Sequence, residues 1–316
     1  MTVDVVIPVY HPDEGFIKLL ERLLQQSLLP GRVIIANTGK SSWQLFEERY
    51  HDRMEKIRSL LGERFVLFHL EKEEFDHADT RNRAMEMAKA DLVLVMTMDA
   101  IPADKELIGN LAGCFEQEDV AVAYARQLPR KDATMSERIA RNFNYPDRDR
   151  KKNLSDLKEL GIKTYFCSDV CAMYKKSVWE ACGRFAAPAL FNEDMVFAAA
   201  AMKQGYSVFY KAGAKVYHSH NYTGKQQFSR NFDLAVSQKM HPEVFEGISS
   251  EKEGIRMLRR NIALLLKSGH GLEIFPLIYI SGCKYLGYFL GKRYQKLPRS
   301  LVRKWSTDPV FWDKLG

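Results

Sequence analysis

Short apolar runs alternate with helix-patterned segments through the first 125 residues, and this alternation limits the fold more than any other feature. The runs of strand length are residues 3–10, 32–37, 64–70, 91–98 and 119–124. The segments with apolar side chains at helical spacing are residues 13–26, 43–61, 79–88 and 105–115. Such a rhythm predicts βαβ units and an α/β fold with a mainly parallel central sheet flanked by helices, as in Rossmann-like proteins.

Three polar side chains lie at the carboxyl ends of predicted strands. These are Tyr10, Asn37 and Asp99. Ligands of parallel sheets bind at the carboxyl ends of the strands, so this edge is the expected binding site. A carboxylate at the position of Asp99 suits magnesium or manganese holding a diphosphate. The alternative is a helix N-cap, but Asp104 is a better cap for the helix that follows.

An acidic pair, Glu193 and Asp194, opens a later helix-patterned stretch. Acids in a first turn often only complement the helix dipole. Adjacent side chains point in different directions, however, so one can face a reaction site. We hypothesise that Asp194 takes a proton from an attacking hydroxyl, while Glu193 supports it or contacts the acceptor.

Two imidazoles, His218 and His220, close a strand-patterned stretch. On a strand they share one face, whereas on a turn they need not. Neutral imidazole is a good ligand for a metal such as manganese. We favour His218 as the ligand because it directly ends the apolar run, and the alternative is a pair of half-exposed polar residues.

Arg81 lies in the first turn of the helix expected from Asp79, with Asp79 or Thr80 as the N-cap. A cation there opposes the helix dipole and needs a partner. A nucleotide base or phosphate is one candidate, and a salt bridge with Asp76 or Asp79 is the other.

Residues 126–164 are polar and too long for an ordinary connection, which predicts a flexible loop or a helical excursion near the site. The five cysteines are odd in number and scattered, which favours free thiols in a cytosolic protein. A zinc site formed by Cys167, Cys171 and Cys182 is the alternative, but the spacing is poor for zinc.

The positive charge of the chain is concentrated in residues 250–316, which hold 13 Lys or Arg and 5 Asp or Glu. Apolar and aromatic residues edged by cations predict an interfacial helix lying on an anionic bilayer. A helical cap on the main domain, or a dimer contact, is equally compatible with the pattern. No stretch of 18 residues is free of charge, so no membrane-spanning helix is expected.

Several common catalytic motifs are missing from the sequence. It has no Gly-x-Gly-x-x-Gly after the first strand, no P-loop and no Gly-x-Ser-x-Gly. A dinucleotide oxidoreductase, a P-loop enzyme and a serine hydrolase are therefore unsupported. A nucleotidyltransferase would need a basic glycine-rich loop after the first strand, and residues 11–15 are not one. Nucleic-acid binding is disfavoured because the body outside the tail is near neutral.

In chain order, these segments resemble the family 2 glycosyltransferases of the GT-A fold, and within them a rhamnosyltransferase branch. The matching motifs cover about residues 1–235 and are Val-Val-Ile-Pro-Val-Tyr (5–10), Ala-Asn-Thr-Gly (36–39), Thr-Arg-Asn-Arg-Ala (80–84), Thr-Met-Asp-Ala (97–100), Asn-Glu-Asp-Met (192–195) and Val-Tyr-His-Ser-His-Asn-Tyr-Thr (216–223).

The resemblance implies inverting transfer of a sugar from a nucleotide-sugar donor, with Mn²⁺ or Mg²⁺. It places the donor nucleotide at Pro8, Tyr10, Asn37, Arg81, Asn82 and Asp99. It gives Asp194 the role of base with Glu193 beside it, and assigns the metal to Asp99 and His218, with His220 as the less favoured ligand. Asn37 stands where many members carry Asp, and Thr97 stands where the first acid of the usual Asp-x-Asp would be.

The predicted organisation is a GT-A domain over residues 1–249, followed by a basic amphipathic helical extension over 250–316. Residues 1–125 would be the nucleotide-binding half and 126–249 the acceptor and catalytic half. The expected reaction moves a sugar, L-rhamnose from dTDP-rhamnose by the resemblance, to a glycan or lipid-linked acceptor in cell-surface polysaccharide synthesis. The expected location is the inner face of the cytoplasmic membrane, and oligomerisation stays open. The alternatives are a hexosyltransferase using a UDP-sugar, or an inactive glycan-binding or scaffold protein.

Overall fold

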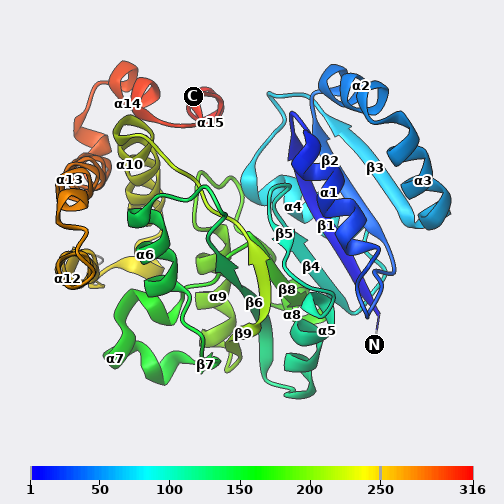
Figure 1. Ribbon diagram of the computed structural model, residues 1–316, viewed down its shortest axis with the longest axis horizontal. Helices are drawn as coiled ribbons and strands as arrows, with labels where there is room; N and C mark the ends of the chain where they lie inside the picture. Colours follow the sequence, from blue (N-terminus) through cyan, green and yellow to red (C-terminus); the bar gives the residue numbers. More distant parts are fainter. Residues whose placement is uncertain (1, 249–250, 316) are drawn as a thin grey trace.

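Each apolar run of the amino-terminal part becomes a strand of one sheet in the computed structural model, which describes residues 2–248 and 251–315 (Figure 1). Across these residues the sheet has nine strands, with the order β3-β2-β1-β4-β8-β6-β9-β5 and β7 paired to β9. The strands are β1 (Val3–Tyr10), β2 (Val33–Thr38), β3 (Phe65–Leu70), β4 (Leu92–Met96), β5 (Ile101–Pro102), β6 (Val120–Leu128), β7 (Arg150–Lys152), β8 (Cys171–Lys175) and β9 (Ser207–Tyr217).

The sheet is mixed but mainly parallel, as expected from the sequence. Strands β3, β2, β1 and β4 are parallel neighbours. Strand β8 pairs antiparallel with both β4 and β6, and β9 runs parallel to β6. The carboxyl ends of β1, β2, β4, β6 and β9 therefore point the same way, which brings the residues after these strands to one edge.

Helices cover both faces of the sheet, because the buried strands are apolar on both sides. In β1, Val5 and Ile7 pack in one core cluster with α1 and α3, and Val6 packs in another with α4 and α9. The helices of the main body are α1 (Glu14–Leu23), α2 (Lys40–Arg49), α3 (His51–Leu61), α4 (His77–Glu86), α5 (Leu107–Ala112), α6 (Met135–Asn144), α7 (Leu157–Leu160), α8 (Lys176–Ala181) and α9 (Glu193–Lys203).

Several expected boundaries were wrong for local reasons. The single helix expected over residues 43–61 is divided at Tyr50 into α2 and α3. The N-cap of α4 is Asp76, whose carboxylate accepts the backbone N–H groups of Ala78 and Asp79, so the helix starts before the predicted cap. Asp104 does not cap α5: its carboxylate accepts the N–H of Glu106, one residue before the helix.

Residues 126–164 form a helical excursion rather than a structureless loop. Strand β6 runs on to Leu128, and α6, β7 and α7 follow before β8. In Figure 1, α6 lies between the sheet and the carboxyl-terminal helices. This excursion therefore places α6 beside the end of β9.

The carboxyl-terminal region is helical and gathers at the side of the molecule away from β1–β3 (Figure 1). Its helices are α10 (Gly224–Met240), α11 (Pro242–Phe245), α12 (Glu251–Lys267), α13 (Ile274–Gly291), α14 (Arg299–Trp305) and α15 (Pro309–Lys314). The predicted boundary at residues 249–250 lies outside the described residues. By length and composition alone, residues 271–291 could cross a membrane, contrary to the expectation of no such helix.

Helix α13 lies directly on α10 through two glycines, Gly287 and Gly291. A Cβ at either position would collide with the backbone carbonyl of Phe228 or Phe232. The Tyr288 hydroxyl also donates a 2.8 Å hydrogen bond to Gln238 Oε1 on α10. Close backbone contact thus fixes one face of α13 against α10.

The variant Gly287→Ala should therefore destabilise the protein, by about 1–3 kcal/mol, because the helices must separate to admit the methyl group. Gly282→Ala on the same helix is the matched control, since its Cβ would meet nothing within 4 Å. There, alanine should stabilise the helix by about 0.5–1 kcal/mol. Urea denaturation compares the two, and equal midpoints would contradict the packing described.

Candidate active site

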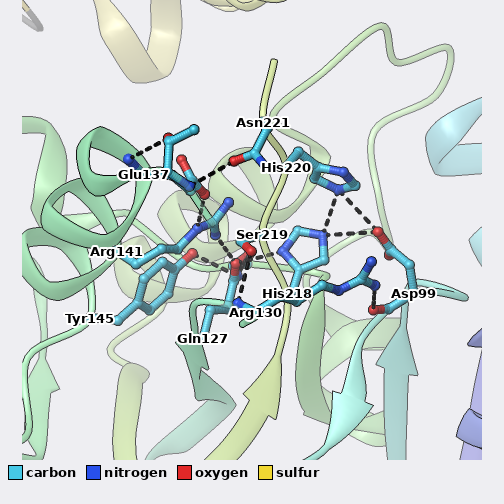
Figure 2. A network of polar contacts seen from close by, with 12 residues as sticks. Asp99, Gln127, Arg130, Glu137, Arg141, Tyr145, His218, Ser219, His220 and Asn221 are labelled. Atoms are coloured by element: carbon cyan, nitrogen blue, oxygen red, sulfur yellow. Dashed lines mark hydrogen bonds and ion pairs between the residues drawn. The ribbon is translucent and has the colours of Figure 1, made fainter. Parts of the chain in front are cut away.

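An aspartate and two histidines meet at the carboxyl edge of the sheet. Asp99 follows β4, and His218 and His220 follow β9. Asp99 Oδ2 lies 3.4 Å from His218 Nε2 and 3.0 Å from His220 Nε2. The two Nε2 atoms are 3.1 Å apart, and Figure 2 shows both rings directed at the carboxylate. One oxygen and two nitrogens of this kind are a fitting ligand set for a divalent cation.

Gln127 on β6 fixes the tautomer of His218. Its Oε1 faces Arg141 Nη1, which can only donate, so this atom must be the amide oxygen. The same oxygen lies 2.9 Å from His218 Nδ1, which must then carry the proton. In the neutral ring Nε2 is left with its lone pair facing Asp99. A ring proton held on the outer nitrogen is the usual arrangement of metal-binding histidines.

The charge states of the cluster also suit a cation. Burial by itself would raise the pKa of Asp99, but a proton on the facing nitrogen of His218 or His220 holds that pKa well below the ordinary value. A cation bound in place of the proton would have the same effect. Burial lowers the pKa of His218, which favours its neutral form. The side chains of Asp99 and His220 keep 28% and 33% exposure, so the cluster can be reached from solvent. An ionised carboxylate and a neutral imidazole are the forms that bind metal.

The segment after β9 alternates the predicted ligands with residues that hold a neighbouring loop. Between the histidines, Ser219 Oγ accepts the N–H of Arg130 at 2.9 Å. Asn221 Oδ1 accepts the N–H of Thr134 at 3.0 Å (Figure 2). Arg130 Nη2 in turn donates to the backbone carbonyl of Asp99 at 2.7 Å. The loop that leads into α6 is therefore fastened over the cluster.

Two buried acids, Asp169 and Glu193, share one guanidinium beside Asp194. Arg81 Nη1 lies 3.1 Å from Glu193 Oε1, and Arg81 Nε lies 3.4 Å from Asp169 Oδ2. The Asp194 carboxylate accepts the backbone N–H groups of Met195 at 2.7 Å and Asp169 at 3.2 Å. Burial and the carboxylates of Asp169 and Glu193 raise the pKa of Asp194 well above its ordinary value. A raised pKa makes Asp194 a stronger proton acceptor.

Gln127, Ser168 and Asp169 connect Asp194 to the cluster of Asp99, His218 and His220. Gln127, which orients His218, donates through Nε2 to Ser168 Oγ at 2.9 Å. The next residue, Asp169, donates its N–H to Asp194. These hydrogen bonds, with the peptide link from Ser168 to Asp169, connect the predicted metal ligands to the predicted base. Asp99 and Asp194 are more than ninety positions apart in sequence.

The residues assigned to the donor nucleotide lie in different surroundings. Tyr10 is 48% exposed at the end of β1. Asn37 is buried and donates to Gly39 O and faces His69 Nδ1, while its Oδ1 has no partner among the described residues. Pro8 is half-buried in β1, two residues before Tyr10.

Arg81 and Asn82 already have protein partners. The Arg81 ion pairs are with Asp169 and Glu193, not with Asp76 or Asp79. The Asn82 side chain accepts a hydrogen bond from the N–H of Phe185 and donates one to its carbonyl. A nucleotide could contact Arg81 or Asn82 only by sharing these side chains with their present protein partners.

Two residues of the network were not predicted from the sequence. Gln127 lies in the polar segment read as an excursion, and no local signal marks it. Asp169 lies in the largely apolar run of residues 166–175, and an acid in such a run is itself a signal. Its pKa is raised to about 7 by burial, against the lowering effect of Arg81.

The role of Gln127 gives a testable prediction. Replacing Gln127 with Met removes the acceptor that fixes His218, and manganese affinity should fall about 10–100-fold. Gln127→Glu keeps an acceptor for both His218 Nδ1 and Arg141, and should restore most of the affinity. Titration with Mn²⁺ by electron paramagnetic resonance measures both variants. Equal losses in the two variants would show that Gln127 acts only through packing.

A Rossmann-like sheet whose strand ends bring together an aspartate and two histidines that could hold a metal ion, beside buried acids, is typical of glycosyltransferases of the GT-A class. The chain belongs to glycosyl transferase family 2, whose model matches residues 4–183. It is a glycosyltransferase, and the family and fold expected from the sequence are both confirmed.

Curated relatives match most or all of the chain. It is 34% identical over 319 aligned positions to the O-antigen chain rhamnosyltransferase RfbN of Salmonella typhimurium, covering 100% of this chain and 97% of that protein. It is 39% identical over 246 positions to the O-antigen chain rhamnosyltransferase WbaN of Salmonella anatum, covering 77% of each.

A solved structure with the same fold is the mannosyltransferase PcManGT from Pyrobaculum calidifontis, in complex with GDP-Man and Mn²⁺. Its TM-score is 0.53 at 12% identity, and the match covers 98% of this chain and 84% of that one. At this identity the likeness establishes the GT-A fold alone.

Proposed function

We propose that this chain transfers L-rhamnose from dTDP-rhamnose, with inversion, to a glycan or lipid-linked acceptor in the synthesis of a cell-surface polysaccharide. One observation carries the proposal. Asp99, His218 and His220 lie close enough together to hold a metal ion, and they are connected through Gln127, Ser168 and Asp169 to Asp194. The choice of rhamnose rests on the two relatives described as O-antigen chain rhamnosyltransferases.

The reaction is a single displacement at the anomeric carbon. The acceptor hydroxyl oxygen forms the new bond to this carbon, while the bond from the carbon to the diphosphate oxygen breaks. The hydroxyl proton passes to Asp194, and the electron pair leaves with the diphosphate. Attack opposite the leaving group inverts the configuration.

The acids around Asp194 prepare it for this task. The backbone N–H groups of Met195 and Asp169 stabilise the ionised form of Asp194. The carboxylates of Glu193 and Asp169 disfavour a further negative charge on it, which raises its pKa. Arg81 holds these two acids in place. An Mn²⁺ or Mg²⁺ ion held by Asp99 and His218, with His220 beside them, would act as a Lewis acid that stabilises charge on the departing diphosphate.

The donor nucleotide fits the end of β1 and β2. The exposed ring of Tyr10 offers a stacking surface for the base, with Pro8 before it. The Oδ1 atom of Asn37, which has no partner among the described residues, can accept an N–H of the base or a ribose hydroxyl. We assign residues 1–125 to the nucleotide and 126–249 to catalysis and the acceptor.

Thermal shift with a donor panel tests the proposed sugar. With Mn²⁺ present, dTDP-rhamnose should raise the melting temperature more than UDP-glucose, UDP-N-acetylglucosamine or GDP-mannose, since a ligand at 100 times its Kd stabilises by about 2.7 kcal/mol. Release of dTDP should stop when a chelator is added. A larger shift with a UDP-sugar would point to the other hexosyltransferase, and binding without turnover to a glycan-binding module.

We further propose that the enzyme lies on the inner face of the cytoplasmic membrane through α12 and α13. The outer face of these helices exposes large apolar side chains, including Leu266 (61% exposed), Leu272 (85%), Phe275 (74%) and Tyr279 (64%). Only 22% of the apolar window of residues 271–291 is buried, and its other face packs on α10. Residues 250–316 add 13 cations against 5 acids, which complements an anionic lipid surface.

The double variant Leu272→Asp/Phe275→Asp should lose binding to anionic vesicles, because two carboxylates would enter the apolar part of the interface. Flotation with phosphatidylglycerol vesicles, against phosphatidylcholine alone, measures this. Leu45→Asp is the control, since Leu45 is 67% exposed on α2, outside the carboxyl-terminal region. Unchanged flotation of the double variant would exclude this face as the membrane surface and leave a contact between two copies.

A further inference from the structure

A cavity of about 220 Å³ lies beside the metal cluster and is open to solvent. Its walls come from α6, the segment after β9, α12 and α13, so it forms only because the carboxyl-terminal helices pack near α6. His220 and Tyr222 form the wall nearest the cluster. Its volume is below the about 300–1,000 Å³ of usual small-molecule sites, which limits it to a ligand near the size of one sugar ring.

One buried polar side chain that lines this cavity has an unused hydrogen-bond acceptor. Asn261 of α12 is 1% exposed, and its Oδ1 atom has no hydrogen-bond partner among the described residues. Burial of an unpaired amide oxygen costs about 1–3 kcal/mol, so a ligand that donates a hydrogen bond would recover that cost. A buried acceptor that lines a cavity therefore points to a bound donor group.

The charges of the cavity favour a neutral ligand with hydroxyl groups. Lys284 of α13 lines it and makes no hydrogen bond or ion pair within the described residues. Glu137 and Glu273 line it as well, with Glu137 paired to Arg141 at 2.6 Å. A phosphate would meet two carboxylates and could not donate to Asn261. A sugar hydroxyl can donate to Asn261 and accept from Lys284.

The apolar part of the lining suits the other surface of a sugar ring. Met257, Leu277 and Ile280 contribute side chains on the α12 and α13 side. Tyr222 is stacked on His220 with ring centroids 4.8 Å apart, and the guanidinium of Arg230 lies 4.7 Å from the centroid of the same tyrosine ring. Aromatic and aliphatic surface beside a few fixed polar groups is the ordinary composition of a carbohydrate-sized pocket.

We propose that this cavity is a subsite for a sugar residue of the acceptor glycan, with Asn261 and Lys284 binding its hydroxyl groups. This subsite rests on the proposed function, because an acceptor glycan is bound only if the chain transfers sugar to one. The subsite joins the catalytic edge to the helices proposed to lie on the membrane, so a glycan attached to a lipid would reach the reaction centre from that side.

Saturation-transfer NMR on the full chain with Mn²⁺ and dTDP tests the subsite. The probes are the methyl glycosides of galactose, mannose and rhamnose, with pyrophosphate as the competing anion. At least one glycoside should receive saturation, and the variants Asn261→Leu and Lys284→Met should each weaken its binding about tenfold. Lys267→Met is the matched control on α12, because Lys267 is exposed and does not line the cavity. The dTDP signal should be unchanged in all three variants.

The outcomes separate this inference from the proposed function. No saturation of any glycoside, or equal binding by both variants and the control, would overturn the subsite while dTDP binding still stands. Displacement of the glycoside by pyrophosphate would also overturn it, in favour of a lipid diphosphate. Glycoside binding without dTDP binding would support a sugar site and contradict the proposed donor. Lys284→Met keeps the test decisive if Asn261→Leu fails to fold.

Discussion

Replacement of Asp194 with Asn is expected to reduce sugar transfer by about 10²–10⁴-fold, the usual contribution of a general base. The amide keeps the shape of the side chain but cannot take the proton of the acceptor hydroxyl. Donor binding should be unchanged, because no contact assigned to the nucleotide involves Asp194. Initial rates of dTDP release, with dTDP affinity measured in parallel, give both quantities.

Asp91→Asn is the matched control for this variant. Asp91 is exposed before β4, at the opposite end of the strand from Asp99, and its replacement should leave the rate unchanged. Near-normal transfer by the Asp194 variant would remove it from the mechanism. Loss of donor affinity in that variant would instead indicate damage to the whole site.

The raised pKa of Asp194 also predicts the direction of the pH dependence. The base must be ionised to accept a proton, so the rate falls as the pH drops through its pKa. Because burial and the neighbouring carboxylates raise that pKa, the acidic limb should lie above the ordinary aspartate value. Replacing Arg81 would remove the cation that pairs with Asp169 and Glu193, and should move the limb to still higher pH.

The second large effect is expected for Asp99. The variant Asp99→Asn removes the charge of the only carboxylate in the cluster, and manganese affinity and transfer should both fall by about 10²-fold or more. The remaining activity should respond little to a chelator. Asp104→Asn is the control on the other side of β5, because Asp104 is 39% exposed and its one ion pair among the described residues, with Lys215, is long at 3.8 Å.

The two histidines should not be equivalent. His218 is buried and oriented by Gln127, whereas His220 keeps 33% exposure and stacks on Tyr222. His218→Ala should therefore cost more manganese affinity than His220→Ala. The reverse order would mean that the exposed ring is the principal ligand.

The arrangement of strands could be predicted from the sequence because both its signals are local. Buried parallel strands are short apolar runs, and the helices between them have apolar residues at a period of 3.6. Tyr10, Asn37 and Asp99 could be placed at one edge because each lies at the carboxyl end of such a run. The helix break at Tyr50 and the N-cap at Asp76 depend on turn geometry and carry weaker signals.

The network behind the site could not be predicted in the same way. Gln127 orients His218 across 91 positions of sequence, and Asp169 reaches Asp194 across 25. These pairings follow from the positions of β6, β8 and β9 in the sheet, not from spacing along the chain. The cavity at Asn261 likewise depends on how α12 and α13 settle against α6, which polarity and periodicity do not specify.

Anomalous diffraction at the manganese edge, from crystals grown with Mn²⁺ and dTDP, tests the central claim most directly. The account predicts a single strong peak within about 2.5 Å of Asp99 Oδ2 and His218 Nε2, with the diphosphate on its open side and Asp194 across the same cleft. A peak bound away from these two atoms, or an equal peak in crystals of the Asp99→Asn variant, would contradict it.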